Sequence, residues 1–160
     1  MKRADLFRTL LTNRFSTSAL LWAKLPLAAF AGLRVTRLDS TGAEVALPAG
    51  WKTQNPFRST YFAAQAMAAE LSTGAPALML IEESGAKVSS LVTGLSAKFT
   101  RKATQRTVFI CADGEAMKAA VDEAVRTGEP VIFVARSVGR QDDGTEVASF
   151  EITWSFKKKA

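Results

Sequence analysis

The chain has 160 residues, of which 48% are apolar, and its formal net charge is +6. This length and apolar content fit one folded domain and exclude a largely disordered chain. The sequence contains no histidine, which excludes Ser-His-Asp and Cys-His catalysis and every histidine-ligated metal site. Any general base is therefore expected to be a carboxylate, with lysine or tyrosine less favoured.

Residues 1–24 are predicted to form an amphipathic helical extension. Its apolar residues gather on one side, and basic residues interrupt the apolar run, which argues against a signal peptide. No apolar run reaches the length of a membrane-spanning helix, so we expect a cytoplasmic protein without a membrane span. Residues 33–50, "LRVTRLDSTGAEVALPAG", are then predicted to form a hairpin that turns at "DSTG".

A long apolar helix is predicted over about residues 56–72. Asn55 is a favoured N-cap residue, and Pro56 suits the first helical position. Gly74 is predicted to end the helix, and Pro76 to prevent its continuation. A helix that is apolar nearly all round is expected to be enclosed by other elements.

One stripe of this predicted helix holds Ser59, Ala63, Ala66 and Glu70. Small residues on such a stripe leave room either for a partner helix or for a ligand. Two interpretations of Glu70 stay open from the helix alone. It is either a solvated carboxylate on an exposed edge, or a base or hydrogen-bond acceptor at the end of a groove.

Strands are predicted after the helix, beginning with "ALMLIE". The segment 87–103 alternates, which places one set of its residues on a single face: Leu91, Thr93, Leu95, Ala97 and Phe99. The next strand, "QRTVFICA", holds the single cysteine, Cys111, which we interpret as a small buried residue. A helix over 113–128 is predicted between strands, with Asp113 as its N-cap.

The chain is predicted to close with a hairpin whose last strand alternates strictly. Phe150, Ile152, Trp154 and Phe156 face one way. The fold class expected from these elements is α+β, with a mostly antiparallel sheet around one apolar helix. We expect a single domain over 1–160, with 1–24 as an extension and 113–128 as an insertion.

This order of elements resembles the hotdog fold, in particular the phenylacetyl-CoA thioesterase-like branch and uncharacterised thioesterase-like families near it. That branch has an Asn followed fifteen residues later by an acid, and Asn55 and Glu70 have this spacing. The ending "ELSTG" and the paired strands from "VSSLVTGLSAKFTRKATQRTVFICA" are also similar. Where the branch has His-Gly-Gly, this chain has Tyr61, Phe62 and Ala63.

The resemblance implies thioester hydrolysis, with coenzyme A as part of the substrate and no separate cofactor or metal. Glu70 would activate water or attack directly, and Asn55 would orient the water or the carbonyl. The helix start would hold the developing oxyanion and the substrate through Ser59, Thr60, Tyr61, Phe62 and Ala63. The acid and the helix start would come from different subunits of a homodimer, with a dimer of dimers left open. The groups that would meet the phosphates are Arg58, Lys98, Arg101, Lys102 and Arg106.

Three other functions are weighed against this hypothesis. The missing His-Gly-Gly favours a non-catalytic hotdog protein that binds an acyl group or acyl-CoA. A hydratase on this fold generally relies on an Asp-His pair, which this chain lacks. Nucleic-acid binding is disfavoured because the basic residues are spread along the chain and no aromatic-rich RNA-binding stretch is present.

Overall fold

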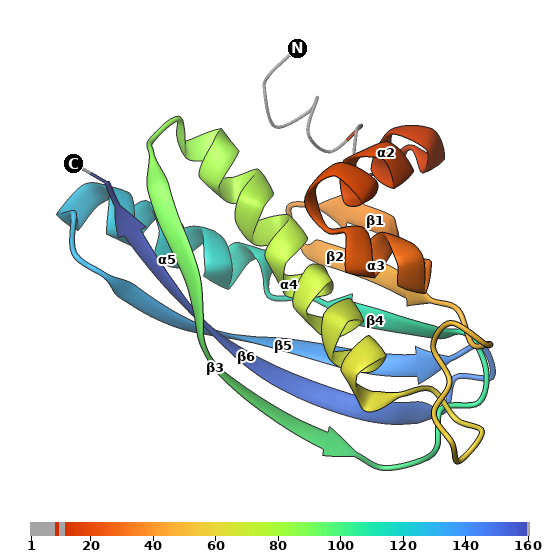
Figure 1. Ribbon diagram of the computed structural model, residues 1–160. Coiled ribbons are helices and arrows are strands. Elements are labelled where there is room, and N and C mark those ends of the chain that lie inside the picture. Colours follow the sequence, from red (N-terminus) through yellow and green to blue (C-terminus); the bar gives the residue numbers. More distant parts are fainter. Residues whose placement is uncertain (1–8, 10–11, 160) are drawn as a thin grey trace.

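The computed structural model describes residue 9 and residues 12–159. Six antiparallel strands form one sheet in the order β1-β2-β4-β5-β6-β3 (Figure 1). The strands are β1 (Arg34–Asp39), β2 (Gly42–Leu47), β3 (Val88–Phe99), β4 (Thr107–Cys111), β5 (Val131–Gln141) and β6 (Glu146–Lys158). The predicted α+β class is confirmed.

Four named helices accompany the sheet: α2 (Arg14–Lys24), α3 (Pro26–Ala31), α4 (Phe62–Ser84) and α5 (Gly114–Thr127). Helix α4 crosses one face of the sheet, which we call the inner face, and contacts β2, β4, β5 and β6 there. Helix α5 packs beside α4, and α2 and α3 lie next to each other near β1 (Figure 1). Leu6, Leu10 and Leu11 of the predicted extension lie outside the described residues.

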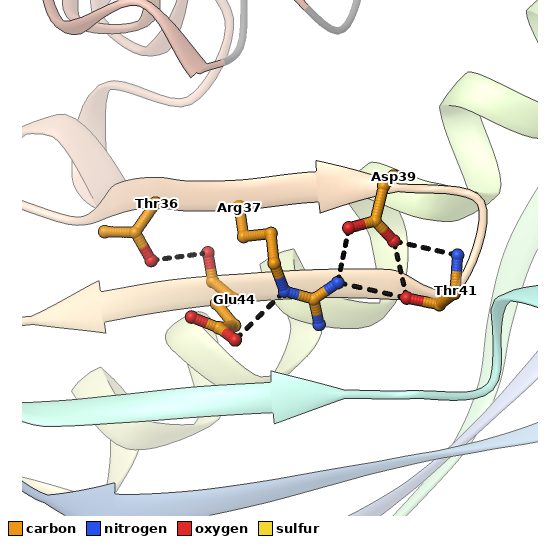
Figure 2. A network of polar contacts seen from close by, with 5 residues as sticks. All are labelled: Thr36, Arg37, Asp39, Thr41 and Glu44. Carbon is orange, nitrogen blue, oxygen red and sulfur yellow. Dashed lines mark hydrogen bonds and ion pairs between the residues drawn. The ribbon is translucent and has the colours of Figure 1, made fainter.

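The predicted hairpin is β1 and β2, and a polar network joins the two strands (Figure 2). The Arg37 guanidinium donates to Glu44 across the hairpin, at 3.0 Å, and to Asp39 on its own strand, at 2.6 Å. Asp39 also accepts from the hydroxyl and the backbone N–H of Thr41. The turn is therefore held by side chains of β1 and β2 together with Thr41 in the turn itself.

The central helix begins and ends later than predicted, over Phe62–Ser84 instead of 56–72. Its N-cap is Tyr61, not Asn55, because the Asn55 side chain closes a separate loop. Gly74 and Pro76 lie inside the helix, and "ALMLIE" is helical rather than a strand. The helix ends at Gly85, whose φ of 66° fits a glycine.

Burial explains why the helix continues past both stop signals. A proline inside a helix costs about 3 kcal/mol. The following turn places Ala77, Met79 and Leu80 in the core, and burying large apolar side chains stabilises by about 1.5–3 kcal/mol each. A Cβ on Gly74 would lie 3.4 Å from the Trp154 ring, so this glycine allows close packing rather than ending the helix.

Strand β3 does not keep one alternation, contrary to the prediction for 91–99. Its register against β6 shifts between Val92 and Gly94, which marks a β-bulge. Leu91 pairs with Ser155, whereas Leu95 pairs with the core residue Ile152. The bulge therefore puts Leu91 on the outer face and Leu95 on the inner face.

The alternation predicted for the last strand is correct. Inward residues of β6 line the core, and each is at most 6% exposed: Phe150, Ile152, Trp154 and Phe156. Cys111 is buried as expected. Asp113 precedes α5 but makes no capping bond with its side chain; it accepts instead from the backbone N–H of Arg136, 2.7 Å away, on β5.

Candidate functional site

Glu70 lies in the middle of α4 and is half-buried against the inner face of the sheet. A Cβ on Gly74 would lie 3.2 Å from Glu70 Oε1, so the carboxylate extends along the helix toward Gly74 and Trp154. Burial raises the pKa of Glu70 above its ordinary value of 4.5. Within the described part of the chain, no hydrogen bond or ion pair compensates this carboxylate.

A second contact fixes the helix to the sheet at this point. The indole N–H of Trp154 donates to Thr73 Oγ1 at 3.1 Å, and the Thr73 hydroxyl donates to the backbone carbonyl of Glu70 at 3.0 Å. Thr73 is fully buried and Trp154 is 6% exposed. The position of Glu70 along the sheet is thus set by a buried hydrogen-bond chain.

The small-residue stripe predicted beside Glu70 is present only in part. Ala63, Ala66 and Glu70 lie on α4, and all three are half-buried. Ser59 precedes the helix and is 8% exposed, so it does not continue the stripe. The apolar surface that leads from Glu70 to the helix start therefore consists of alanines and Phe62.

Asn55 has a structural role in the loop before α4. Its Oδ1 accepts from the N–H of Phe57 at 3.0 Å and from the N–H and hydroxyl of Ser59, each at 3.2 Å. Arg58 lies between them with a φ of 59°. The Asn55 oxygen is therefore occupied, and only its amide Nδ2 has no partner among the described residues.

Most of the backbone N–H groups predicted to hold an oxyanion are already bonded. The Ser59 N–H donates to Asn55, the Thr60 N–H to Ala103 and the Tyr61 N–H to Thr53. The first two N–H groups of α4, those of Phe62 and Ala63, have no acceptor within the described part of the chain. A helix N-terminus presents such groups with a favourable dipole for negative charge.

These N–H groups lie at the edge of an open groove of about 570 Å³. Its lining includes aromatic and basic side chains: Phe57, Tyr61, Phe62 and Phe99, with Arg101 and Lys102. The rings of Tyr61 and Phe62 contact each other edge-on, 5.0 Å between centroids, and Phe62 contacts Phe99 at 6.3 Å. The side chains of Tyr61 and Phe62 remain about half exposed.

Gln65 lies beneath this groove and was not predicted as a site residue. It is 4% exposed, and its Nε2 donates to the Thr60 carbonyl at 3.1 Å. Its Oε1 is buried without a partner in the described structure. No sequence signal distinguishes Gln65, because its burial follows from where the helix begins. Trp154 was likewise predicted only as a core residue, since its contact with α4 joins residues 81 positions apart.

The five predicted phosphate-binding cations do not converge. Arg101 and Lys102 line the groove at the helix start. Lys98 lines a different depression on the outer face, and Arg106 pairs with Asp142 at 2.7 Å. Arg58 is exposed in the loop. Only two of the five cations therefore share a groove with the helix start.

Glu70 and the helix start are also separated within one chain. Phe62 and Glu70 are eight residues apart on α4, which corresponds to about 12 Å along the axis. A reacting carbonyl must lie about 3 Å from both the base-activated water and the oxyanion donors. One chain alone therefore does not bring these groups to one carbonyl.

The fold is similar to several solved structures, at identities that establish the fold alone. A Pseudomonas aeruginosa protein of unknown function, described as "Probable Thioesterase", is 19% identical, with a TM-score of 0.70 over 97% of this chain and 95% of the other. A protein of unknown function from Chlorobaculum tepidum has a TM-score of 0.76 at 16% identity, over 93% and 99%. A thioesterase from Haemophilus influenzae has a TM-score of 0.63 at 17% identity, over 93% and 95%.

A comparison with functionally curated proteins gave no match. The sheet wrapped on α4 and the similarity to these solved structures together show that this is a hotdog-like fold. A family model matches residues 13–156, almost the whole described chain. The chain therefore belongs to the family described as "Domain of unknown function (DUF4442)".

Proposed function

We propose that this protein hydrolyses acyl-CoA thioesters with Glu70 as the base. The observation that carries the proposal is the state of this carboxylate: half-buried, without a compensating charge, and fixed by the Thr73–Trp154 hydrogen bond. Perturbed carboxylates without a structural partner occur preferentially at functional sites. Glu70 would activate a water or attack the thioester carbonyl directly, and Asn55 would orient the carbonyl through Nδ2.

The proposed oxyanion site uses fewer backbone N–H groups than those of residues 59–63. The N–H groups of Phe62 and Ala63 would hold the developing negative charge, because those of Ser59, Thr60 and Tyr61 are already bonded. Since these donors lie about 12 Å from Glu70 in the same chain, a second subunit would supply one of the two. A homodimer with α4 helices running in opposite directions would place each Glu70 opposite the other helix start.

Two surface features support such a homodimer. Strand β3 is at the edge of the sheet and is twelve residues long, and a long edge strand readily pairs with another chain. Apolar side chains on the inner side of this edge are about half exposed: Leu95 at 54%, Phe99 at 48% and Phe62 at 57%. Pairing two β3 strands would cover these residues, and a dimer of dimers would need a further surface.

The substrate would lie between the two subunits. The acyl group would occupy the apolar surface along Ala63, Ala66 and Phe62, and the coenzyme A phosphates would meet Arg101 and Lys102 at the groove. Arg58, Lys98 and Arg106 would contribute only if the second subunit brings them near. The spacing from Asn55 to Glu70 also supports a relationship to the phenylacetyl-CoA thioesterase-like branch.

The test is hydrolysis of an acyl-CoA series from acetyl to palmitoyl by the purified wild type and by Glu70→Gln. We expect Glu70→Gln to lower kcat/KM by about 10²–10⁴-fold. Glu82→Gln, an exposed glutamate on the same helix, is the matched control and should retain activity. In the wild type, kcat/KM should rise with pH through a pKa above 4.5, because only the carboxylate acts as a base.

Two results would contradict parts of this proposal. Full activity in Glu70→Gln would remove the assigned base. Tight binding of acyl-CoA without turnover by the wild type would support a non-catalytic acyl-CoA-binding protein. The feature that favours this second function is the aromatic pair Tyr61 and Phe62 at the helix entry, where the resembling branch has His-Gly-Gly.

A further inference from the structure

A second exposed apolar surface lies away from Glu70, on α2, α3 and the loop after β2. Five large side chains form this surface, which we call the helical patch: Trp22 (55% exposed), Leu25 (45%), Leu27 (67%), Phe30 (42%) and Trp51 (74%). Scattered single apolar residues are normal on a protein surface, but adjacent large ones indicate an interaction site. The proposed hydrolysis does not use any of these residues.

Contacts join α3 to the loop after β2 within the patch. Phe30 and Trp51 pack edge-on with 6.2 Å between ring centroids, although 21 positions separate them. Leu27 and Phe30 are three residues apart on α3 and therefore lie on the same side of this helix. Lys52 Nζ lies 5.2 Å from the centre of the Phe30 ring. The loop after β2 and α3 thus present one joint surface.

The charged residues of the chain segments that form the patch are all positive. Lys24, Arg34 and Lys52 border it and are exposed. The sequence has no aspartate or glutamate from residue 6 to 38 or from 45 to 69. None of these three cations makes an ion pair with a described residue. An apolar surface with tryptophans and leucines, bordered by these exposed cations, matches the interface of an anionic bilayer.

We propose that the helical patch docks this protein on the surface of anionic membranes. Trp22, Leu27 and Trp51 would enter the headgroup region, and Lys24 and Lys52 would meet the lipid phosphates. Each basic residue near such a surface strengthens binding about five-fold. No described helix is long and apolar enough to cross a membrane, so the docking is peripheral.

A second copy of this chain fits the patch less well. In a two-fold symmetric contact, the same surface meets itself. Lys24, Arg34 and Lys52 would then face their own copies, which is electrostatically unfavourable because the segments that form the patch contain no acid to pair with them. An anionic lipid surface supplies the missing negative charge.

The experiment measures co-sedimentation of the full chain with two kinds of vesicles, phosphatidylcholine alone and an equal mixture with phosphatidylglycerol. We expect binding to the mixed vesicles and little to the neutral ones, with binding weakened by added salt. The double variant Leu27→Glu/Phe30→Glu should bind the mixed vesicles at least about ten-fold more weakly. Ile132→Glu/Val134→Glu is the matched control, because these β5 residues are 59% and 48% exposed, far along the sheet from the patch.

A charge-reversal variant, Lys24→Glu/Lys52→Glu, keeps the apolar side chains and should lose the preference for anionic vesicles. Equal binding to both vesicle types, or equal effects of the patch and control variants, would overturn the proposal. A smaller mass of Leu27→Glu/Phe30→Glu in solution, with vesicle binding unchanged, would assign the patch to a second copy instead. Thioester hydrolysis enters none of these measurements, so the outcome is independent of the proposed activity.

Discussion

Ser72 of α4 and Ser137 of β5 bring their hydroxyl oxygens to within 2.7 Å of each other, and both residues are fully buried. The Ser72 hydroxyl also lies 2.8 Å from the backbone carbonyl of Ala69, to which it donates. Ser137 then donates to Ser72. This pair ties the central helix to the middle of the sheet, one residue away from Thr73.

The two serines are predicted to differ in their effect on stability. Ser72→Ala leaves the Ser137 hydroxyl buried without a partner, which should lower the free energy of unfolding by about 1–3 kcal/mol. Ser137→Ala should cost less, because Ser72 keeps its bond to Ala69. In the double variant the losses should not add. Denaturant unfolding of the wild type, the two single variants and the double variant measures these free energies. Equal losses in the two single variants would show that Ser137 does not donate its proton to Ser72.

Glu70 is predicted to lower stability at neutral pH. Its folded pKa is raised above the unfolded value, so the folded state binds the proton more tightly. Its contribution to stability is therefore fully present below pH 4.5 and is lost as the pH rises through the folded pKa. Glu70→Gln should raise Tm by about 2–4 °C at pH 8 relative to the wild type, with a smaller gain at pH 4. A lower Tm at pH 8 would indicate that the carboxylate has a stabilising partner.

Gly139 lies in β5 where the register against β6 shifts, and it is predicted to tolerate no side chain. A Cβ there would lie 2.7 Å from the ring of Phe109, which is fully buried. Gly139→Ala should therefore destabilise the fold by about 1–3 kcal/mol. Gly94→Ala is the matched strand control, because its Cβ would meet only Thr153 at 3.4 Å. Equal unfolding midpoints for the two variants would mean that the core around Phe109 rearranges at little cost in free energy.

Asp39 is predicted to remain ionised in acid. The Thr41 hydroxyl and then the Arg37 guanidinium hold the pKa of this carboxyl at about 2 (Figure 2). Because the folded pKa is lowered, the contribution of Asp39 to stability is present above pH 3.8 and is lost as the pH falls toward 2. Thr41→Val should raise the pKa measured by NMR. The stability loss should stay below about 1 kcal/mol, because the network is partly exposed.

The sequence predicted most strands correctly because their signals are local. The "DSTG" turn marks the β1–β2 hairpin, and the alternation from Phe150 to Phe156 marks the buried side of β6. The predicted start of the central helix was wrong because Asn55 closes a loop with the same kind of hydrogen bonds that it would use to cap a helix. The predicted end of the helix was wrong because burial of the helix in the core outweighs the local stop signals of Gly74 and Pro76.

The positions of the candidate site residues were predicted in part for the same reason. Glu70 was identified from helical geometry, since it lies well inside the helix under either boundary. Ser59 was placed on the same stripe only because the helix was expected to begin too early. The contacts that distinguish Glu70, with Trp154 and Gly74, depend on how β6 meets α4. Such long-range contacts leave no periodic pattern in the sequence.

The bulge near Thr93 also bears on how the edge strand can vary in length. β3 has one more residue than the segment of β6 that it pairs with. Leu91 and Leu95, four positions apart on either side of the bulge, therefore lie on opposite faces of the sheet. A deletion of this extra residue would leave Leu91 opposite Ser155 and Leu95 opposite Ile152, because the remaining residues of β3 would then pair one to one with those of β6. An insertion or deletion in the turn after Gln141 would leave both faces unchanged. At the free edge of the sheet, the loss of the single codon for Thr93 would thus restore one continuous ladder and leave both faces of the strand as they are.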